Sequence, residues 1–375
     1  MTVVDIAKRL MEYDTSGPPT KEKPLAEYIR DYLVDLGINA EIQDVAPERA
    51  NVIAKIGEGK GAGLCLSGHI DVVPAGDLDL WKISSTYEPI VKDRKLYGRG
   101  ACDMKGPDAC LIQAVEDLLD HDFKRQLTLL FTAGEDTGGW FINKIVGEGK
   151  VTSDEARFGV IPEPTMMELV RCHKASGGAR VQINGKAAHS SRPELGVNAI
   201  MKSVPLLEEM KSLQKELEKT QHPLLGPSTI VPTIMNGGHK GNIIPESCNI
   251  NFNARLITEH QGSEHIQGWM ENVLKKCRER DPEFDATLLS ARGGTALDIP
   301  EENEIVQLLK NILGSDPVGA PYFTEAITLT NAGIPTVICG PGNIDQAHTA
   351  DEYITLDQLD LGVSVFKKLI THVCL

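Results

Sequence analysis

Five short segments of the chain carry side chains that bind divalent metal ions, and each lies near the end of an apolar run. They contain two histidines and several carboxylates and cover residues 68–71, 100–106, 134–136, 162–165 and 346–349. Imidazole nitrogens together with carboxylate oxygens are ligands that suit zinc and pairs of divalent ions. Such a pair activates water and polarises a carbonyl group, so hydrolysis of an amide bond is the first reaction to test.

Four of the apolar runs lack the polar alternation of half-exposed strands, which is typical of strands buried in a parallel sheet. They cover residues 63–67, 127–131, 158–161 and 335–339. Open α/β sheets place their sites just beyond the carboxyl ends of the strands. His69, Glu135 and Glu163 follow the first three runs within a few residues. His348 follows the fourth after a longer loop, so we expect all four segments at one crevice.

The length of 375 residues exceeds what one ordinary hydrophobic core supports, since such cores stop growing at roughly 250 to 300 residues. Two domains are therefore expected. An apolar content of 41% with 24% charged residues is typical of a soluble globular protein. The chain has no uninterrupted apolar run of about 18 residues, and its first residues lack the layout of a signal peptide. We therefore expect a cytoplasmic protein.

The formal net charge of −15 excludes nucleic acid and anionic membranes as expected partners, because no block of Lys and Arg offsets it. The eight cysteines form no C-x-x-C pair, and several lie within apolar runs. In such places cysteine behaves as a small apolar side chain. The cysteines are therefore expected to be reduced and structural.

Helical periodicity alternates with the buried strands at both ends of the chain. We predict helices at residues 23–36, 107–121, 304–313 and 356–372. The first and the third are followed by Gly37 and Gly314, which suit helix C-termini. This alternation predicts an α/β domain with a mostly parallel sheet flanked by helices.

The middle of the chain shows a different pattern, with alternating strands and two longer helices in the order β-α-β-β-α-β. The predicted elements cover residues 179–184, 198–220, 229–235, 249–256, 262–278 and 286–290. That order predicts a ferredoxin-like α+β domain inserted into the larger one. We therefore expect a metal-binding domain of residues 1–175 and 291–375 and an inserted domain of residues 176–290.

His69 and Asp71 are separated by one residue, so in an extended strand end both side chains face the same side. Asp71 could then accept the proton of one ring nitrogen while the other nitrogen binds metal. The alternative is an ordinary turn. Two metal ions about 3.5 to 4 Å apart also need a bridging carboxylate. Asp103 is the best placed, because its loop carries glycines on both sides.

Glu135 and Asp136 form an adjacent acidic pair at a predicted strand end. One carboxylate can bind metal while its neighbour serves as the general base for water, and the pattern leaves open which does which. Glu163 stands between two prolines that stiffen the backbone. His348 would supply a further nitrogen ligand.

The five motifs, in this order and over nearly the whole chain, resemble the family of co-catalytic zinc amidohydrolases and exopeptidases. That family includes acetylornithine deacetylases, succinyl-diaminopimelate desuccinylases, aminoacylases and carboxypeptidase G. The resemblance implies two divalent ions, zinc in the first place, with cobalt or manganese as alternatives. It implies that His69 and Glu163 bind one ion, that Asp136 and His348 bind the other, and that Asp103 bridges them.

The resemblance also implies that Glu135 is the general base and that the peptide after the bridging Asp103 is cis. The chain departs from the family's usual Asp-Glu-Glu at residues 134–136, where it has Gly-Glu-Asp. The side chain of Asp136 is therefore shorter than the usual glutamate, which would affect the distance between the two metal ions and the choice of metal.

Residues 187–199 resemble the lid motif of the family. The resemblance implies a homodimer in which His189 of one subunit stabilises the oxyanion in the other. Asn242 and Arg255 match substrate-binding positions. Arg255 would hold the carboxylate of an N-acyl amino acid or a short peptide, because a planar guanidinium binds carboxylates through two hydrogen bonds.

Two C-terminal motifs, residues 321–326 and 340–353, are most similar to those of the acetylornithine deacetylases. The expected reaction is therefore release of acetate and a free amino acid. We hypothesise that Glu325, in the first motif, faces the site and favours a substrate with an ammonium group.

Three alternatives stay open. A desuccinylase, or a metallo-carboxypeptidase or dipeptidase, would use the same ions on another substrate. A catalytically silent binding homologue is a different class, and the presence of all five ligand positions and the base argues against it. A nicotinamide-dependent dehydrogenase would also suit a parallel sheet, but the chain lacks the G-x-G-x-x-G phosphate-binding pattern.

Overall fold

The computed structural model describes all 375 residues, and the chain folds into two compact units. Unit 1 consists of residues 1–171, 299–318 and 324–375, and unit 2 of residues 172–298 and 319–323. The inserted unit therefore begins four residues earlier and ends eight residues later than the predicted 176–290. The added residues include those of β15 (Leu297–Asp298), which pairs with the end of β8 (Val170–His173).

Unit 1 is built on a sheet whose strands follow the order β1-β2-β6-β3-β7-β17-β8. Its strands are β1 (Asn39–Ala46), β2 (Arg49–Ile56), β3 (Gly63–His69), β6 (Leu127–Thr132), β7 (Ala156–Ile161), β17 (Thr336–Ile338) and β8. The four central strands, β6, β3, β7 and β17, are parallel, as predicted. The antiparallel β1–β2 hairpin at one edge was not predicted.

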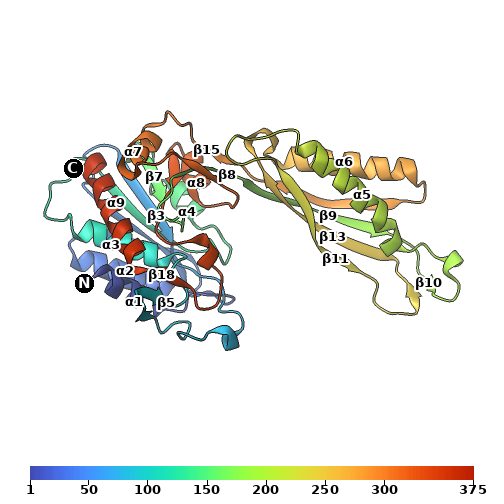
Figure 1. Ribbon diagram of the computed structural model, residues 1–375, viewed down its shortest axis with the longest axis horizontal. Coiled ribbons are helices and arrows are strands. Elements are labelled where there is room, and N and C mark those ends of the chain that lie inside the picture. The colour runs from blue at the N-terminus through green and yellow to red at the C-terminus, as the bar shows by residue number, and fades with distance from the viewer. The chain divides into compact units, whose positions relative to one another are not determined.

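Helices cover the sheet on both sides, which explains why every residue of β3 and β6 is buried. Helices α3 and α9 pack on β3, while α8 packs on β7 and β17, and Figure 1 shows the two groups on opposite sides of the sheet. The helices of unit 1 are α1 (Val3–Met11), α2 (Lys23–Asp35), α3 (Lys105–Glu116), α4 (Ile142–Gly147), α7 (Glu304–Leu313), α8 (Ala326–Asn331) and α9 (Leu356–Cys374).

The termini of α7 show how local sequence sets a helix boundary. The Asn303 side chain accepts a hydrogen bond from the Ile305 N–H group, which caps the helix N-terminus. Gly314 ends the helix in the left-handed region, with φ at 72°. Helix α7 therefore spans the predicted residues.

Unit 2 contains the predicted β-α-β-β-α-β sequence and forms a four-stranded antiparallel sheet in the order β11-β13-β9-β14. Helices α5 and α6 pack on one face of this sheet. The core lies between the helices and the sheet, where buried apolar side chains alternate along the inner strands β9 and β13. The elements are β9 (Ala175–Asn184), α5 (Ala199–Leu217), β11 (Thr229–Gly237), β13 (Ser247–Leu256), α6 (Ser263–Arg280) and β14 (Asp285–Gly293).

The remaining strands are short. They are β4 (Ile90–Lys92), β5 (Lys95–Tyr97), β10 (Ala188–His189), β12 (Ile243–Ile244), β16 (Val318–Ala320) and β18 (Tyr353–Thr355). Strands β18, β5 and β4 form a small sheet of their own, and β10 pairs with β12. None of the helices combines the length and the apolar composition needed to cross a bilayer.

Candidate metal centre

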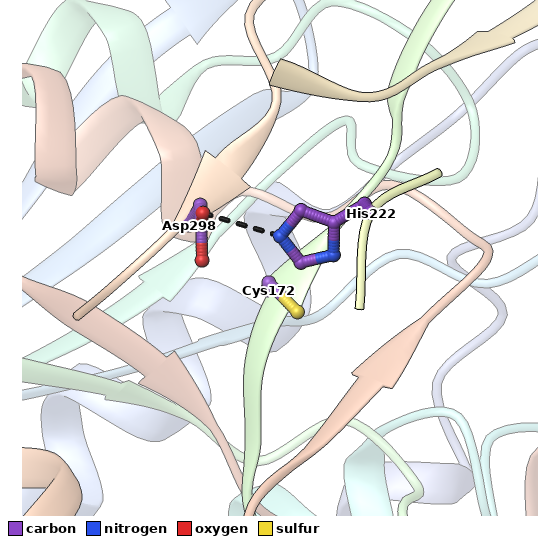
Figure 2. A group of neighbouring side chains, drawn as sticks. All are labelled: Cys172, His222 and Asp298. Atoms are coloured by element: carbon purple, nitrogen blue, oxygen red, sulfur yellow. Dashed lines mark hydrogen bonds and ion pairs between the residues drawn. The ribbon is translucent and has the colours of Figure 1, made fainter. Parts of the chain in front are cut away.

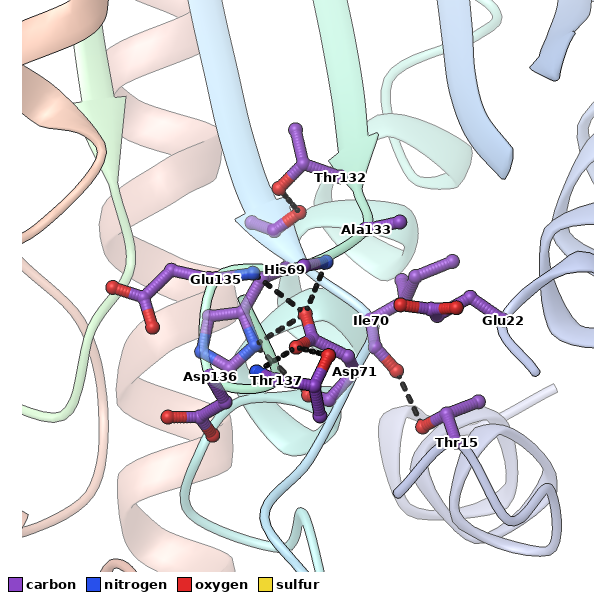
Figure 3. A network of polar contacts seen from close by, with 12 residues as sticks. Thr15, Glu22, His69, Ile70, Asp71, Thr132, Ala133, Glu135, Asp136 and Thr137 are labelled. Carbon is purple, nitrogen blue, oxygen red and sulfur yellow. Dashed lines mark hydrogen bonds and ion pairs between the residues drawn. The ribbon is translucent and has the colours of Figure 1, made fainter. Parts of the chain in front are cut away.

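The central strands of unit 1 end at one edge of the sheet, and the side chains predicted to bind metal follow those ends. His69 is the last residue of β3, and Glu163 follows β7 by two residues. Glu135 and Asp136 lie in the loop after β6. Figure 3 shows both of their carboxylates on the side of this loop that faces away from Glu22.

Two groups of side chains with metal-ligand chemistry meet here, and they share Asp103. In the first group, His69 Nε2 lies 3.0 Å from Asp103 Oδ1 and 3.9 Å from Glu163 Oε1. In the second, His348 Nε2 lies 3.2 Å from Asp103 Oδ2 and 3.2 Å from Asp136 Oδ1. One carboxylate oxygen of Asp103 therefore faces each group. The structure brings the five side chains together in the grouping that the family resemblance implies.

The site crowds negative charge into the protein interior. Asp103 and Glu163 are each 6% exposed. Asp136 has a buried oxygen, Oδ2, with no hydrogen-bond partner. Buried carboxylates are costly unless cations or hydrogen-bond donors compensate them. The unpartnered oxygen and the mixed nitrogen and oxygen donor set fit a pair of divalent cations.

Side chains of the site, His348 and Glu163 among them, hold protons at neutral pH when no metal is bound. Hydrogen bonds to Asp103 and Asp136 raise the pKa of His348 to about 10. Burial and the nearby charge of Asp103 raise the pKa of Glu163 to about 8. A metal ion must displace these protons, because it binds the unprotonated forms.

Asp103 behaves differently from its neighbours. Burial by itself would raise the pKa of Asp103, but hydrogen bonds from His348 and His69 lower it overall. Burial raises the pKa of Asp136 despite its contact with His348. Asp103 therefore keeps its charge in the absence of metal. The peptide from Asp103 to Met104 is cis, as the resemblance implied.

A buried ion pair that sequence reasoning missed fixes the backbone around Asp103. The Glu352 Oε1 atom accepts hydrogen bonds from the N–H groups of Cys102 at 2.8 Å and Asp103 at 3.0 Å. Arg99 donates from its NH1 group to Glu352 Oε2 at 2.6 Å. The only sequence signal was the position of Glu352 shortly after His348, in the same C-terminal motif.

The predicted contact between Asp71 and His69 needs correction. His69 Nδ1 lies 2.9 Å from the backbone oxygen of Asp71, whereas the carboxylate Oδ1 is 3.7 Å away. The backbone carbonyl therefore accepts the ring proton and leaves Nε2 for metal. This arrangement is possible because the chain turns after β3 and brings the Asp71 carbonyl back toward the ring.

The Asp71 carboxylate organises the loop after β6 instead (Figure 3). Its Oδ1 accepts hydrogen bonds from the N–H groups of Gly134 at 2.9 Å and Glu135 at 3.1 Å. Its Oδ2 accepts from the N–H and the hydroxyl of Thr137, each at 2.8 Å. Asp71 therefore positions the segment that carries Glu135 and Asp136.

Strand β2 supports the same loop from the other side. Arg49 forms an ion pair with the fully buried Glu22, and its NH2 group donates to the Thr137 hydroxyl at 2.8 Å. The Asn51 Oδ1 atom accepts from the Ala133 N–H group at 2.9 Å. The β1–β2 hairpin, which the sequence analysis did not predict, thereby helps to position the site.

Glu135 is partly exposed, in keeping with a group that must reach water. Burial, together with the charges of Glu163 and Asp136, raises the pKa of Glu135 well above its ordinary value. Its backbone is held by Asp71, as described above. A carboxylate of raised pKa is suited to accept a proton and release it again near neutral pH.

Glu325 lies in the interior, beneath the strand ends. Its side chain is 2% exposed, and Oε2 accepts a hydrogen bond from the Thr132 hydroxyl at 2.7 Å. Burial raises the pKa of Glu325 to about 7. Direct contact with a substrate ammonium group therefore stays a prediction, and the burial of the side chain weighs against it.

The other three predicted site residues belong to unit 2. His189, on β10, is exposed, and its Nδ1 atom lies 2.7 Å from the Ser191 hydroxyl. The backbone oxygen of Asn242, which is also exposed, accepts from the Ser190 N–H group. Arg255, on β13, is half-buried and stands opposite Thr229 and Ser176 of the neighbouring strands.

Unit 2 holds a third group with metal-ligand chemistry, Cys172, His222 and Asp298 (Figure 2). His222 Nδ1 accepts hydrogen bonds from the N–H groups of Leu224 and Leu225, each at 3.2 Å. The ring proton is therefore on Nε2, which lies 3.2 Å from Asp298 Oδ2. Metal at Nε2 would require a proton on Nδ1 and would break both backbone hydrogen bonds. We therefore assign this group a structural role: it holds the loop formed by His222, Leu224 and Leu225 in place.

The sequence profile of the Peptidase family M20/M25/M40 matches residues 65–372. The chain therefore belongs to this family of metallohydrolases.

Two curated relatives cover nearly the whole chain. The chain is 30% identical to an acetylornithine deacetylase of Myxococcus xanthus, over 94% of the chain and 92% of that protein. It is also 30% identical to a probable succinyl-diaminopimelate desuccinylase of Staphylococcus epidermidis, over 97% of the chain and 95% of that protein. These relatives act on different acyl groups, so similarity to them leaves the substrate open.

A solved structure supports the fold. The M20 family metallo-carboxypeptidase Sso-CP2 of Sulfolobus solfataricus superposes with a TM-score of 0.78 at 17% sequence identity. The match covers 99% of this chain and 98% of that one. At this identity the likeness concerns the fold alone, an α/β unit with a mostly parallel central sheet.

Proposed function

We propose that the protein hydrolyses the amide bond of N-acyl amino acids at a site for two divalent metal ions. The observation that carries this proposal is Asp103, which turns one oxygen to each of two ligand groups. A bridging carboxylate is what two adjacent ions need, and an amide is the bond that such a pair helps water to attack.

His69 and Glu163 would hold one ion, and Asp136 and His348 the other, with Asp103 between them. Zinc is the first candidate, since imidazole and carboxylate ligands suit it, and cobalt and manganese are the alternatives. Bound there, the ions would lower the pKa of water and polarise the substrate carbonyl.

Glu135 is the proposed general base. It takes a proton from the attacking water as the water oxygen bonds to the carbonyl carbon. When the C–N bond breaks, Glu135 returns that proton to the departing nitrogen. The products are a carboxylic acid and a free amine, and Glu135 ends the cycle in its starting state.

His189 is proposed to donate a hydrogen bond to the oxyanion in the partner subunit of a homodimer. Its exposure within its own chain supports a role toward another copy. Strand β11 is an edge strand with exposed Val231 and Ile234, and Met201 and Val204 are exposed on neighbouring α5. An open apolar edge of this kind pairs readily with a second copy.

N-acetylornithine is the first substrate to test, because the motifs around Glu325 and His348 resemble those of acetylornithine deacetylases, and several curated relatives are acetylornithine deacetylases. Arg255 and Asn242 are proposed to hold the carboxylate end of the substrate. A guanidinium group fits that role through its paired donors.

The test is a hydrolysis panel of N-acetylornithine, N-succinyl-diaminopimelate and simple dipeptides, with zinc, cobalt and manganese added in turn. We expect metal-dependent release of amine from an N-acyl amino acid. A protein with both metal sites filled that hydrolyses none of these amides would contradict the proposal and favour a silent binding homologue.

A further inference from the structure

A hollow of about 330 Å³ lies at the edge of the unit 1 sheet opposite to the metal centre. Its lining includes Lys124 and Arg125, just before β6, and Arg157, at the start of β7. The proposed metal ligands instead follow the far ends of the central strands. Because a strand of six residues is about 20 Å long, a molecule held in this hollow would not touch the metal centre.

The lining of the hollow is basic. The side chains of Lys124 and Arg125 are exposed and form no ion pair and no hydrogen bond within the chain. Arg157 donates from its NH2 group to Glu304 Oε2 at 2.5 Å, and Glu304 is the one acidic side chain of the lining. Leu375 also lines the hollow, and its terminal carboxylate forms no ion pair. In a chain with a net charge of −15, this excess of cations is a local reversal of sign.

Main-chain hydrogen bonds fix this lining without using its cationic groups. The N–H groups of Lys124 and Arg125 donate to the Cys374 carbonyl oxygen at 2.7 and 3.1 Å, which joins the segment before β6 to the end of α9. His372, on the same part of α9, is exposed, lines the hollow and makes no hydrogen bond. The guanidinium groups therefore keep N–H donors for a ligand, and paired donors of this kind match phosphate oxygens.

A second hollow, of about 360 Å³, adjoins the first along α7. The two hollows share Glu304, Leu308 and His372 in their linings. The second contains no Lys or Arg, so it suits an uncharged group, and its volume is within the range of sites for small molecules. Apolar side chains beside amide groups suit a ring that carries hydrogen-bonding atoms. The other lining residues of the second hollow are Gln307, Asn311 and Ile312.

We propose that the two hollows together bind a nucleoside monophosphate, which is a phosphate monoester with an uncharged ring. The phosphate lies in the first hollow, where its three terminal oxygens accept hydrogen bonds from Lys124, Arg125 and Arg157. The ring lies in the second hollow, against Leu308. Glu304 belongs to both linings, and its Oε1, which Arg157 leaves free, accepts a hydrogen bond from a sugar hydroxyl. The order of phosphate, hydroxyl and ring in the ligand thus matches the order of groups along the two hollows.

The experiment measures the binding of AMP, adenosine and inorganic phosphate to the zinc-loaded protein by calorimetry. The parent is compared with Arg125→Met, with Arg157→Met and with the double variant. Lys92→Met is the matched control, because it removes one positive charge from an exposed side chain of β4. Strand β4 belongs to the small sheet beside the start of α9, and His372 lies about 24 Å further along that helix.

We expect the parent to bind AMP more tightly than adenosine or phosphate, since each fragment fills one hollow only. The double variant should bind AMP about 10- to 100-fold more weakly, the range for a charged hydrogen-bonded contact. Arg125→Lys and Arg157→Lys should fall in between, since they keep the charge but lose the paired donors. Lys92→Met should keep the affinity of the parent. Equal affinity of the parent for AMP and phosphate would overturn the assignment of a nucleotide.

Zinc ions also bind phosphate, so AMP could bind at the metal centre instead. Such binding would not depend on Arg125 or Arg157, which lie at the opposite edge of the sheet. AMP binding that the double variant retains in full would therefore place the nucleotide at the metal ions and overturn the proposal. Ile312→Ser tests the second hollow, since it should weaken the binding of AMP and leave the binding of phosphate unchanged. Circular dichroism confirms that each variant is folded.

Discussion

The metal centre of unit 1 and the open face of the unit 2 sheet, which α5 and α6 leave uncovered, handle charge in opposite ways. At the metal centre, carboxylates are buried together, and the carboxylates of Glu352 and Asp71 hold the backbone N–H groups of Asp103 and Glu135. On the open face, Arg180 and Arg292 are exposed and form no ion pair. The first site is costly to leave without cations, whereas the second costs little to leave in water.

This difference indicates which of the two regions is suited to chemistry. A buried, rigid, acidic cluster suits binding of metal ions and stabilisation of charge during a reaction. Exposed arginines on a sheet surface can be replaced without altering the fold. Substitutions at the metal centre should therefore affect catalysis and metal content, and those at Arg180 and Arg292 should leave both the fold and the metal content unchanged.

The largest effect is expected at Glu135. Glu135→Ala should reduce kcat by about 10²- to 10⁴-fold, the usual contribution of a general base. It should retain both metal ions, because Glu135 is not among the proposed ligands. Turnover and metal content, measured on one preparation, check this expectation. Retained activity would assign the base to another residue.

Asp103 and His348 should differ in the number of metal ions that depend on them. Asp103→Asn should weaken the binding of both metal ions, since Asp103 faces both ligand groups. His348→Ala should weaken the binding of one ion and leave the binding of the other unchanged. Metal analysis by mass spectrometry after dialysis gives the stoichiometry. Loss of a single ion from Asp103→Asn would show that Asp103 does not bridge.

Metal binding should depend on pH. The pKa of about 10 for His348 and of about 8 for Glu163 mean that both are protonated at pH 7 in the metal-free protein. Zinc binding should therefore release protons, and the affinity should rise with pH by about tenfold per unit for each proton displaced. Calorimetry in buffers of different ionisation enthalpy counts these protons. Binding without proton release would contradict the protonated state of the site.

A smaller effect is expected at Thr137, which joins Arg49 to Asp71. Thr137→Val removes the hydroxyl that donates to Asp71 and accepts from Arg49. Metal affinity should fall by about 10-fold or somewhat more, the lower end of the range for residues that support ligands. Thr137→Ser keeps the hydroxyl and serves as the control. Equal metal affinity of the Val and Ser variants would show that this support is not needed.

The sequence predicted the parallel strands and the residues at their ends well, because buried strands and metal ligands both leave local signatures. His69, Glu163 and the pair Glu135–Asp136 each follow an apolar run directly. The order of elements in unit 2 was equally clear from its alternation. At these strand ends and in unit 2, the local sequence pattern is sufficient to predict the structure.

The supporting contacts could not be predicted, because they join residues far apart in the sequence. Glu352 and Arg99 are 253 positions apart, and no local pattern connects them. The Asp71 carboxylate binds a loop 63 to 66 positions away instead of the neighbouring His69 ring. The two units meet a few residues away from the predicted borders, at β8 and β15, which are too short to leave a clear pattern.

Asp103 is proposed to lie between two metal ions. Crystals grown with zinc and measured at the zinc absorption edge locate these ions. Two anomalous peaks about 3.5 to 4 Å apart are expected, one on each side of the Asp103 carboxylate. A single peak, or two peaks that Asp103 does not join, would contradict the proposal.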